Sequence, residues 1–371
     1  MRLLYITSAR LPTTKAHGYQ IAKMSEAFQE SGVKLILVAP RRHNPDKKDF
    51  SDYYKLRNKV EVIYLPCADW TFIPWHRLRF WLMILTFGLS LRFFILKNKK
   101  SQIYIREPLL ALFLKGFFLE VHMLPVKMRF YHRWLFGRAK SFIVLTSFIK
   151  RELGLTYPAK KCLVSPDGVD LAEFDIFEKE KVIRQRLGLP IDKKIILYTG
   201  SFYLYGWKGV DVILETAKLF GDDVLFVLVG GNDKDLKKIK KENCLKNIQL
   251  VGFRPHSDMP YYQKAADVLL LPNKTGDRLS EECTSPLKLF EYMASGRPIV
   301  ASDLPSIREV LNENNAVLVS PNLAEALKNG VKSVLINSEQ ANNLAIQAKK
   351  DVREHTWLNR AQKIKEFLAT L

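Results

Sequence analysis

Two loops of the sequence combine lysine and glycine in a pattern suited to binding an anion. Lys15, His17 and Gly18 precede the first predicted helix, and Lys208 lies in the glycine-rich run 200–209, between a predicted strand and a predicted helix. A glycine lets a backbone amide approach an anion, a helix N-terminus adds partial positive charge, and a lysine neutralises phosphate as a compact charge. Each loop alone is a weak indication, because a solvated loop lysine is the commoner explanation.

A third loop gives the strongest indication of chemistry. Ser285 is a suitable N-cap, and Pro286 suits the first turn of the helix that follows, LKLFEYMASG. The free backbone amides of this turn form an anion site suited to a diphosphate. Glu291 lies one turn further on the same side, where a carboxylate can hold a pair of ribose hydroxyls. Because this third loop also suits a diphosphate, the lysine of the run 200–209 is better explained as a phosphate ligand than as a solvated loop residue.

These loops lie between elements of a repeating strand and helix pattern. The chain opens with a predicted strand at Leu3–Ile6, an amphipathic helix around Ile21–Phe28 and a second strand at Val33–Val38. The same order is predicted in the second half of the chain, from a strand at Ile195–Tyr198 and a helix at Val210–Leu219. Further strands are predicted at Val60–Leu65, Gln102–Ile105, Phe142–Leu145, Val224–Val229, Ile248–Val251, Val268–Leu271 and Ile299–Ala301.

The pattern predicts an α/β protein with two doubly wound, Rossmann-like domains that face each other across a cleft. At roughly 150 residues per domain, 371 residues make about two domains. We expect the boundary at the Pro- and Gly-containing segment 164–170, with an N-terminal domain at 1–165 and a C-terminal domain at 166–345. The helical segment 346–371 is expected to pack back toward the N-terminal domain. Neither half contains GxGxxG, which weakens a reading as an NAD or FAD protein.

The excess positive charge is confined to one half of the chain. Residues 1–165 contain 29 Lys and Arg against 10 Asp and Glu, whereas residues 166–371 contain 29 against 28. Such asymmetry indicates an anionic partner, which is a membrane surface, a phosphorylated acceptor or nucleic acid, unless the surface is merely solvated. A nucleic-acid module lacks any recognised reader motif and leaves the second half unexplained. The four cysteines form no CxxC pair and no metal-ligand spacing.

An apolar run at 80–96 falls at the short limit for a membrane span. We predict a buried Rossmann-type helix there, because the run lies between two predicted strands; the alternative is a helix in or on a membrane. Trp70, Phe72 and Trp75 precede it, with Arg77 and Arg79, and would suit a headgroup interface, or the tryptophans pack on the domain core. Because the N-terminus lacks the order of a signal peptide, we expect a cytoplasmic protein, peripheral on the inner membrane face.

Several segments, in the right order over most of the chain, resemble the family 4 glycosyltransferases, which have the GT-B fold. The run SPLKLFEYMASGRPIVASDLPSIREV is similar to the donor-site signature of that family. The other segments that resemble the family are GWKGVDVILETA, VGFRPHSDMPYYQKAADVLLLP, PDGVDLAEF and KAHGYQIAKMSEAFQESG. The resemblance implies retaining transfer of a sugar from a UDP- or GDP-sugar, with no cofactor and no obligatory metal.

The resemblance also implies roles for individual residues. Lys208 would neutralise the departing diphosphate, Glu291 would bind the ribose, and His122, in LEVHMLP, would contact the donor sugar, although a lone histidine is more often structural. The remaining donor-binding residues would be Gly18, Phe253, Arg254, Ser285, Pro286, Leu287 and Lys288. Lys15 and His17 are candidates for binding the acceptor, which we expect to be a lipid-linked or anionic glycan of an envelope polysaccharide or glycolipid.

The chain departs from the family pattern at two positions. Cys283 stands where the family has the first of two glutamates, with Glu281 and Glu282 close by in the wrong register, and Ser201 stands where an arginine is common. Two alternatives therefore stay open. One is a nucleotide-sugar-binding protein without catalytic activity, and the other is a sugar-nucleotide epimerase of the same architecture.

Overall fold

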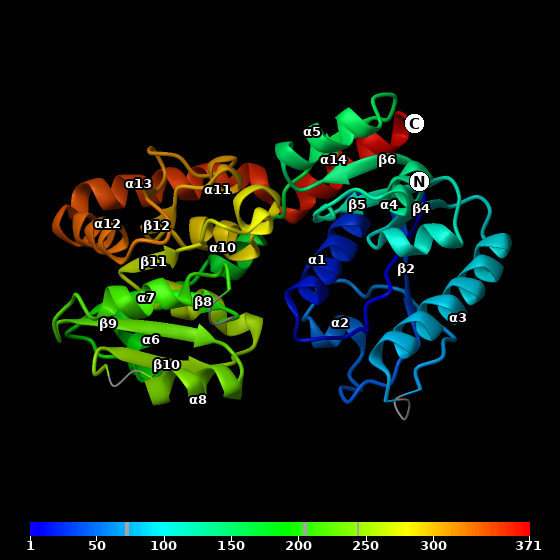
Figure 1. Cartoon of the computed structure of the whole chain (residues 1–371). Helices are drawn as coiled ribbons and strands as arrows, with labels where there is room; N and C mark the ends of the chain where they lie inside the picture. The colour runs from blue at the N-terminus through cyan, green and yellow to red at the C-terminus, as the bar shows by residue number, and fades with distance from the viewer. Residues whose placement is uncertain (71–73, 203–205, 243–244) are drawn as a thin grey trace. The chain divides into compact units, whose positions relative to one another are not determined.

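The computed structural model describes residues 1–70, 74–202, 206–242 and 245–371. The chain forms two compact units (Figure 1). Unit 1 comprises Met1–Pro166 together with Trp357–Leu371, and unit 2 comprises Asp167–Thr356. Unit 2 is thus continuous in sequence, whereas unit 1 is completed by the last residues of the chain.

Unit 1 is built on a parallel sheet of seven strands in the order β3-β2-β1-β4-β5-β6-β7. Its central strands are apolar and buried, as expected for a parallel sheet that is covered on both faces. The strands are β1 (Arg2–Ile6), β2 (Lys34–Pro40), β3 (Val62–Leu65), β4 (Gln102–Ile105), β5 (Phe117–Val121), β6 (Ala139–Val144) and β7 (Cys162–Val164). The helices are α1 (Ala16–Glu30), α2 (Phe50–Tyr53), α3 (His76–Lys97), η1 (Pro108–Leu112), α4 (Phe130–Gly137), α5 (Ser147–Thr156) and α14 (Trp357–Ala369), which packs against α1.

Unit 2 contains a parallel sheet of six strands in the order β10-β9-β8-β11-β12-β13. The strands are β8 (Lys194–Gly200), β9 (Val224–Gly230), β10 (Ile248–Gly252), β11 (Val268–Leu271), β12 (Ile299–Ser302) and β13 (Val317–Val319). The helices are η2 (Leu171–Phe174), α6 (Glu180–Arg186), α7 (Val210–Ala217), α8 (Asp233–Glu242), η3 (His256–Asp258), α9 (Met259–Ala265), η4 (Leu279–Cys283), α10 (Leu287–Ser295), α11 (Pro305–Arg308), α12 (Ala324–Ile336), α13 (Ser338–Asp351) and η5 (Val352–His355).

Alternate residues of β8 belong to two separate apolar cores. Ile195 and Leu197 pack with residues of α6, α9 and α10, whereas Ile196 and Tyr198 pack with residues of α7 and α12. The sheet of unit 2 is therefore covered by helices on both faces, which is the doubly wound arrangement that the sequence predicts. The predicted fold class, two parallel-sheet Rossmann-like domains, is confirmed.

The strand order also shows where ligands bind in such sheets. In each unit the third, second and first strands lie on one side of the sheet, and the fourth and later strands lie on the other. The order reverses between β1 and β4 in unit 1 and between β8 and β11 in unit 2. Ligands of open α/β sheets bind outside the carboxyl ends of the strands at this switch point. The loops that follow β1 and β8 are the lysine and glycine loops singled out from the sequence.

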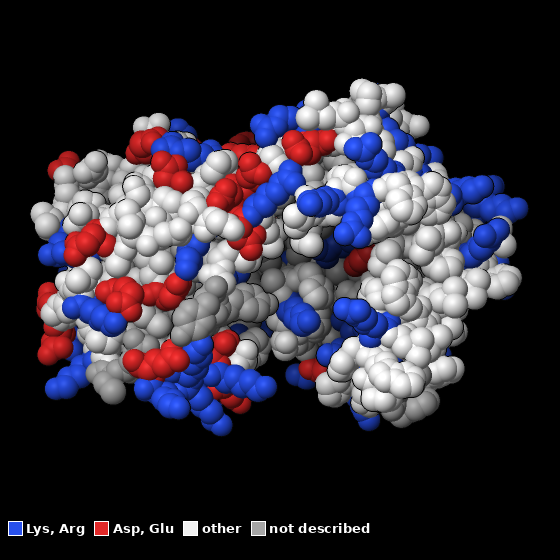
Figure 2. Space-filling model, viewed as in Figure 1, with Lys and Arg blue, Asp and Glu red and all other residues white. Residues whose placement is uncertain are grey.

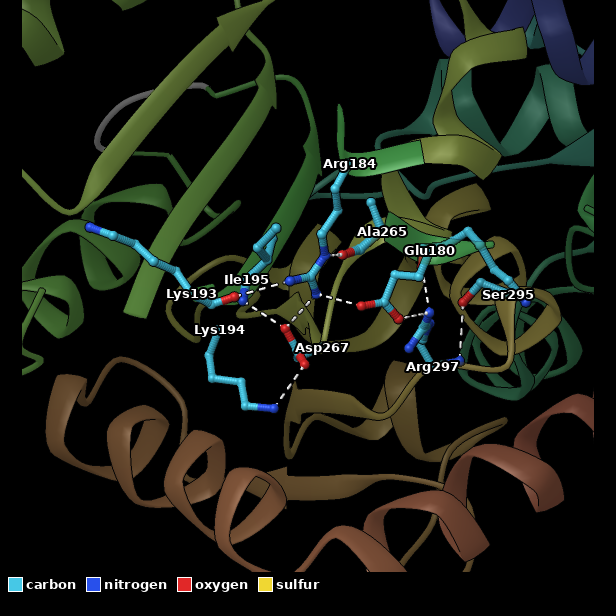
Figure 3. A network of polar contacts seen from close by, with 10 residues as sticks. Glu180, Arg184, Lys193, Lys194, Ile195, Ala265, Asp267, Ser295 and Arg297 are labelled. Atoms are coloured by element: carbon cyan, nitrogen blue, oxygen red, sulfur yellow. Dashed lines mark hydrogen bonds and ion pairs between the residues drawn. The ribbon is translucent and has the colours of Figure 1, made fainter. Parts of the chain in front are cut away.

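A polar network joins the opposite, amino ends of β8 and β11 (Figure 3). The guanidinium of the buried Arg184, on α6, donates to the carbonyl of Ala265 (2.9 Å), the carbonyl of Lys193 (3.0 Å) and the carboxylate of Asp267 (2.8 Å). Arg184 also pairs with Glu180 at 2.8 Å. These contacts satisfy a buried charge in full, so the network fixes α6 and the loop before β11 at the end of the sheet away from the switch point.

The prediction of a buried helix at 80–96 is wrong. α3 is long and apolar enough to cross a membrane by length and composition, yet only 28% of its apolar window is buried. Trp70 and Trp75 are also exposed, so they do not pack on the domain core. Phe72 lies outside the described residues.

Candidate functional site

Lys208 lies in the loop that follows β8, just before α7. The loop continues from Ser201, whose carbonyl accepts a hydrogen bond from the Tyr198 hydroxyl (2.9 Å), and α7 begins after Gly209, which has a left-handed backbone. Lys208 Nζ lies 3.7 Å from the centroid of the Trp207 ring. Burial lowers the pKa of Lys208 to about 8. No carboxylate in the described part of the chain forms a salt bridge with it, so its charge lacks a protein counter-ion.

Lys288 is a second lysine at this strand end, in the first turn of α10; it is buried, whereas Lys208 is half-buried. Its ammonium has no hydrogen-bond partner among the described residues and lies 3.7 Å from the centroid of the Tyr198 ring. The position that a Cβ on Gly200 would occupy is also 3.7 Å from Nζ, so the ammonium reaches the carboxyl end of β8. Burial, and then the charge of Lys208, hold the pKa of Lys288 well below its usual range, while Glu291 acts in the opposite direction.

The two lysines together form a site that requires an anion. Burying an ammonium without a counter-charge is costly, and here two lie close enough for each charge to disfavour the other. The α10 N-terminus adds to this positive character, because no side chain caps it. The N-cap is Pro286, not Ser285 as the sequence suggests; the Ser285 hydroxyl instead accepts a hydrogen bond from the amide of Asp167 (3.0 Å).

The carboxylate of Glu291 is held by two neighbours. Its Oε1 lies 2.8 Å from His256 Nε2, and its Oε2 accepts a bond from Gln263 Nε2 (3.4 Å). Glu173 lies 3.8 Å from the other ring nitrogen of His256. A carboxylate has about four lone-pair sites, so Glu291 retains acceptor capacity toward a ligand. His256 and Gln263 could not be predicted as partners of Glu291, because they are 35 and 28 residues away from it.

The other predicted donor residues of unit 2 lie at the carboxyl ends of strands or at the start of α10. Phe253 and Arg254 follow β10; the Phe253 ring is exposed, and the Arg254 guanidinium donates to the Phe253 carbonyl (3.0 Å). Leu287 is the first residue of α10 and is half-buried. The structure thus brings Lys208, Lys288 and Glu291 to the same edge of the unit 2 sheet.

In unit 1, Arg106 links His17 to His122. Its guanidinium donates to the His17 carbonyl (3.3 Å) and lies 3.0 Å from His122 Nε2. Arg106 follows β4 and His122 follows β5, so all three residues lie at the carboxyl ends of the strands. Burial, and then the charges of Arg106 and Lys15, lower the pKa of His17 to about 4. His17 is therefore neutral at pH 7, and the sequence did not single out Arg106.

A buried carboxylate orients the His122 ring. Glu120 Oε1 lies 3.2 Å from His122 Nε2 and accepts bonds from Arg360 of α14 (2.6 Å) and Gln20 (3.1 Å). Burial alone would raise the pKa of Glu120, but the charges of Arg360, His122 and Arg106 hold it well below its usual range. Glu120 is thus a fixed negative charge beneath His122.

Gly18 makes room for the loop after β1. A Cβ at Gly18 would lie 2.2 Å from the Tyr54 hydroxyl and 2.5 Å from Thr13 Cγ2. The Tyr54 hydroxyl accepts from the Thr13 amide (2.8 Å) and donates to the Thr13 carbonyl (2.9 Å). The Gly18 amide donates to the carbonyl of Lys15, an exposed residue (2.9 Å). The glycine therefore has a steric reason that does not involve an anion.

A cavity of about 800 Å³ opens beside the same loop. Three cationic residues line it, Arg10 from the loop after β1 and Lys47 and Lys48 from the segment after β2, together with one carboxylate, that of Asp46. Thr13 and Tyr53 supply hydroxyl groups. This lining suits an anionic, hydroxyl-rich ligand.

Residues 179–351 match the family model described as "Glycosyl transferases group 1". This stretch, 173 of the 371 residues, is similar to the group 1 glycosyltransferases. Curated relatives include the phosphatidyl-myo-inositol mannosyltransferase of Mycobacterium leprae (strain TN), 27% identical over 192 residues that cover 50% of this chain and 49% of the relative. The amylovoran biosynthesis glycosyltransferase AmsK of Erwinia amylovora is 27% identical over 207 residues, 54% of this chain and 48% of the relative. The chain thus matches about half the length of these relatives.

Solved structures resemble the whole chain. Sucrose-phosphate synthase from Thermosynechococcus elongatus superposes with a TM-score of 0.80 at 19% identity, over 100% of this chain and 98% of that structure. Alr3699/HepE of Anabaena, in complex with UDP, gives a TM-score of 0.75 at 15% identity over 100% of both chains. This similarity shows that the chain has the GT-B fold.

The two glutamates beside Cys283, Glu281 and Glu282, make contacts within the segment that joins β11 to α10. η4 is a π-helical turn in which Glu281 accepts a bond from the Gly276 amide (2.5 Å) and Glu282 pairs with Arg278 (3.4 Å). Cys283 is buried at the end of this turn. Both carboxylates thus stabilise the segment between β11 and α10.

Proposed function

We propose that the protein is a glycosyltransferase that moves a sugar from a nucleoside diphosphate sugar, UDP- or GDP-linked, to an acceptor. The observation that carries this proposal is the pair Lys208, which is half-buried, and Lys288, which is buried, at the switch point of unit 2. Neither forms a salt bridge with a carboxylate among the described residues, and the Lys288 ammonium has no hydrogen-bond partner there. The group 1 family match and the names of the relatives support it, and so does the UDP in the Anabaena structure of the same fold.

The two lysines have the chemistry that departure of a nucleoside diphosphate requires. As the glycosidic bond to phosphate breaks, negative charge builds up on the leaving oxygen, and fixed positive groups in a water-poor site stabilise it. Lys208 and Lys288 supply such positive groups, and the uncapped N-terminus of α10 adds N–H donors. We propose that these groups replace a metal ion and that the transfer retains the anomeric configuration.

The remaining predicted residues receive roles by the same reasoning. We propose that Glu291 accepts bonds from the ribose hydroxyls, with His256 and Gln263 holding its carboxylate in place. Phe253 and Arg254 frame the base. In unit 1, His122 contacts the donor sugar; Glu120 and Arg106 orient its ring.

We propose a lipid-linked or anionic glycan as the acceptor, in polysaccharide or glycolipid synthesis on the cytoplasmic side of a membrane. The cavity lined by Arg10, Lys47 and Lys48 supports an anionic acceptor; Lys15 follows Arg10 in the same loop, and His17 lies in the first turn of α1. Unit 1 contains 32 Lys and Arg against 11 Asp and Glu, whereas unit 2 contains 26 against 27. The unit proposed to receive the acceptor is therefore the cationic one.

Calorimetric titration with UDP, GDP and ADP, followed by transfer assays with the sugar of the base that binds, tests the proposal. Lys208→Ala should lower turnover by about a hundredfold or more. Lys218→Ala is the matched control, because Lys218 is exposed and paired with Glu215 (2.7 Å). Near-normal turnover of Lys208→Ala would remove Lys208 from the site. Nucleotide binding without transfer would favour the silent binding protein that Cys283 suggests, and conversion of the donor without acceptor would indicate an epimerase.

A further inference from the structure

α3 exposes an apolar face. The helix buries Met83, Ile84, Phe87 and Leu91 in unit 1, but its outward residues are also apolar. Its exposed large apolar side chains are Leu78, Phe80, Trp81, Leu85, Leu89, Phe93 and Leu96. A surface helix of a water-soluble protein normally carries charged residues on this side. The outward face of α3 therefore fits a non-aqueous partner.

α3 lies on the surface of unit 1 and is anchored there. A Cβ at Gly88 would lie 2.2 Å from the Phe113 ring, so the helix approaches the segment after η1 as closely as a glycine allows. The Thr86 hydroxyl accepts a bond from the Ala68 amide (2.8 Å), which ties the helix to the chain that follows β3. One face of α3 packs on the core of an α/β unit whose sheet carries loops and charged residues at its edges, so this helix cannot cross a bilayer while it keeps that packing.

α4 and η1 extend the apolar face of α3. Both α3 and α4 pack against η1, and η1 exposes Leu112. α4 exposes Phe130 and Trp134, with Phe130 84% accessible. We call α3, η1 and α4 together the apolar ridge. Figure 2 shows a broad area of uncharged side chains over α3 and α4, with Lys and Arg at its margins.

The charge around the apolar ridge has one sign. Residues 74–150 contain fourteen Lys and Arg and two acidic residues, Glu107 and Glu120. Glu120 is fully buried, and Glu107 accepts bonds from Thr7 and Ser8 in the loop after β1. Cationic residues of the ridge include Arg77, Arg79, Arg92, Lys97, Arg129, Arg133 and Arg138. Aromatic and aliphatic groups rimmed by Arg and Lys match the interface of a bilayer with anionic headgroups.

We propose that the apolar ridge docks unit 1 on an anionic membrane, with α3 lying in the plane of the headgroups and not crossing the bilayer. The exposed Leu, Phe and Trp side chains enter the boundary between headgroups and acyl chains, and the Arg and Lys residues bind anionic lipid. This inference goes beyond the proposed function, because it concerns a surface of unit 1 and needs no activity of the donor site.

Flotation of the full chain with vesicles tests the proposal. The triple variant Leu85→Glu, Leu89→Glu, Phe93→Glu changes only exposed side chains of α3. The matched control is Ile336→Glu, Ile346→Glu, which changes exposed apolar residues of unit 2. We expect the wild type and the control to float with vesicles of about 30% phosphatidylglycerol in phosphatidylcholine at low salt, and the triple variant to bind at least about tenfold more weakly. Binding should weaken in high salt and with pure phosphatidylcholine.

Several results would overturn the proposal. These are no flotation of the wild type with anionic vesicles at low salt, equal flotation of the triple variant, and retention of the wild type in membranes after an alkaline carbonate wash, which would indicate a span. A dimer in solution that the triple variant dissociates, without vesicle binding by either, would assign the ridge to a second copy of the chain. Nucleotide affinity, measured on the same variants, reports on unit 2 separately, so failure here and failure of the proposed function are distinguishable.

Discussion

Replacing Lys288 by methionine should have opposite effects on stability and on nucleotide binding. The ammonium of Lys288 is buried, lies near the charge of Lys208 and has no hydrogen-bond partner among the described residues. Methionine has a similar length and no charge, so it removes the desolvation penalty with little change in packing. The same change removes one of the two cations proposed to bind the diphosphate.

The size of both effects follows from the burial of the group. A buried donor without a partner destabilises a protein by about 1–3 kcal/mol, and more when it is charged, so Lys288→Met should stabilise the free protein by at least that order. For a unit of this size, each kcal/mol corresponds to roughly 2–4 °C in the melting temperature. Loss of a charge-assisted contact to phosphate should weaken UDP binding by about 1.5–3 kcal/mol, which is roughly 10- to 150-fold.

The pH dependence has a defined sign. The pKa of a lysine in the unfolded chain is about 10.4. In the folded protein the pKa of Lys208 is about 8, and that of Lys288 is also lowered. The unfolded chain therefore binds more protons than the folded one in this range, and the unfolding free energy of the wild type should rise with pH above 8. Diphosphate binding requires both lysines to be charged, so UDP should bind with uptake of protons and more weakly as the pH rises.

Scanning calorimetry with and without UDP, and titrations in buffers of different ionisation enthalpy, measure these effects. Lys23→Met is the control, because Lys23 is equally buried but has a carboxylate partner, Glu26, at 3.4 Å. That variant should lower the melting temperature and leave UDP affinity unchanged. A Lys288→Met protein that is less stable than the wild type and binds UDP equally well would refute the assignment of Lys288 to the anion site.

Three further predictions concern other parts of the molecule. Glu291→Gln should weaken UDP and the sugar donor alike by about 1.5–3 kcal/mol in calorimetric titrations; unchanged UDP affinity with reduced turnover would point to a direct catalytic role. Arg184→Met should lower the unfolding free energy in urea by about 1–3 kcal/mol, since it leaves the carbonyls of Ala265 and Lys193 in the network in Figure 3 without this donor. Asp267 keeps its contacts with Lys194 and the Ile195 amide, and KM for the donor should stay constant. The exposed pair of Arg186 with Glu178 offers the control, because Arg186→Met should change stability by less than about 1 kcal/mol. Treatment with EDTA should leave transfer activity unchanged, and activity that is lost in EDTA and restored by Mg²⁺ would contradict the proposed role of the lysines.

The sequence predicts the parts of the fold that depend on local pattern. Alternating strands and helices lead to the doubly wound class, because an apolar run between turn residues fits a strand that is buried on both faces. The edge strands β7 and β13 were not predicted, since each has three residues and is only half-buried. α3 was misjudged for a related reason. A helix that is apolar all round has the same sequence pattern in a core, on a membrane and across one, and only the tertiary structure distinguishes these cases.

For the site, too, the residues that depend on local pattern were predicted, whereas their partners from distant parts of the sequence were not. Lys208 and Glu291 were predicted as site residues because each lies near a strand end or a helix start that is visible in the sequence, whereas Lys288 was predicted only from the family resemblance. Their surroundings were not found. The pairs His256 with Glu291 and Arg360 with Glu120 join residues 35 and 240 positions apart. Such contacts follow from the packing of elements that share no sequence pattern.

The completion of unit 1 by the last residues of the chain has a consequence for protein synthesis. Arg360, which neutralises the buried Glu120 beneath His122, lies in α14, and α14 leaves the ribosome only after all of unit 2. Domains usually fold in the order in which they are made. Until α14 is made, the nascent N-terminal sheet therefore lacks the Arg360 partner of Glu120 and has only Gln20, His122 and Arg106 around that carboxylate, while the inserted unit 2 can fold. Deletion of α14 (Trp357–Ala369) should therefore leave unit 2 intact and unit 1 unfinished.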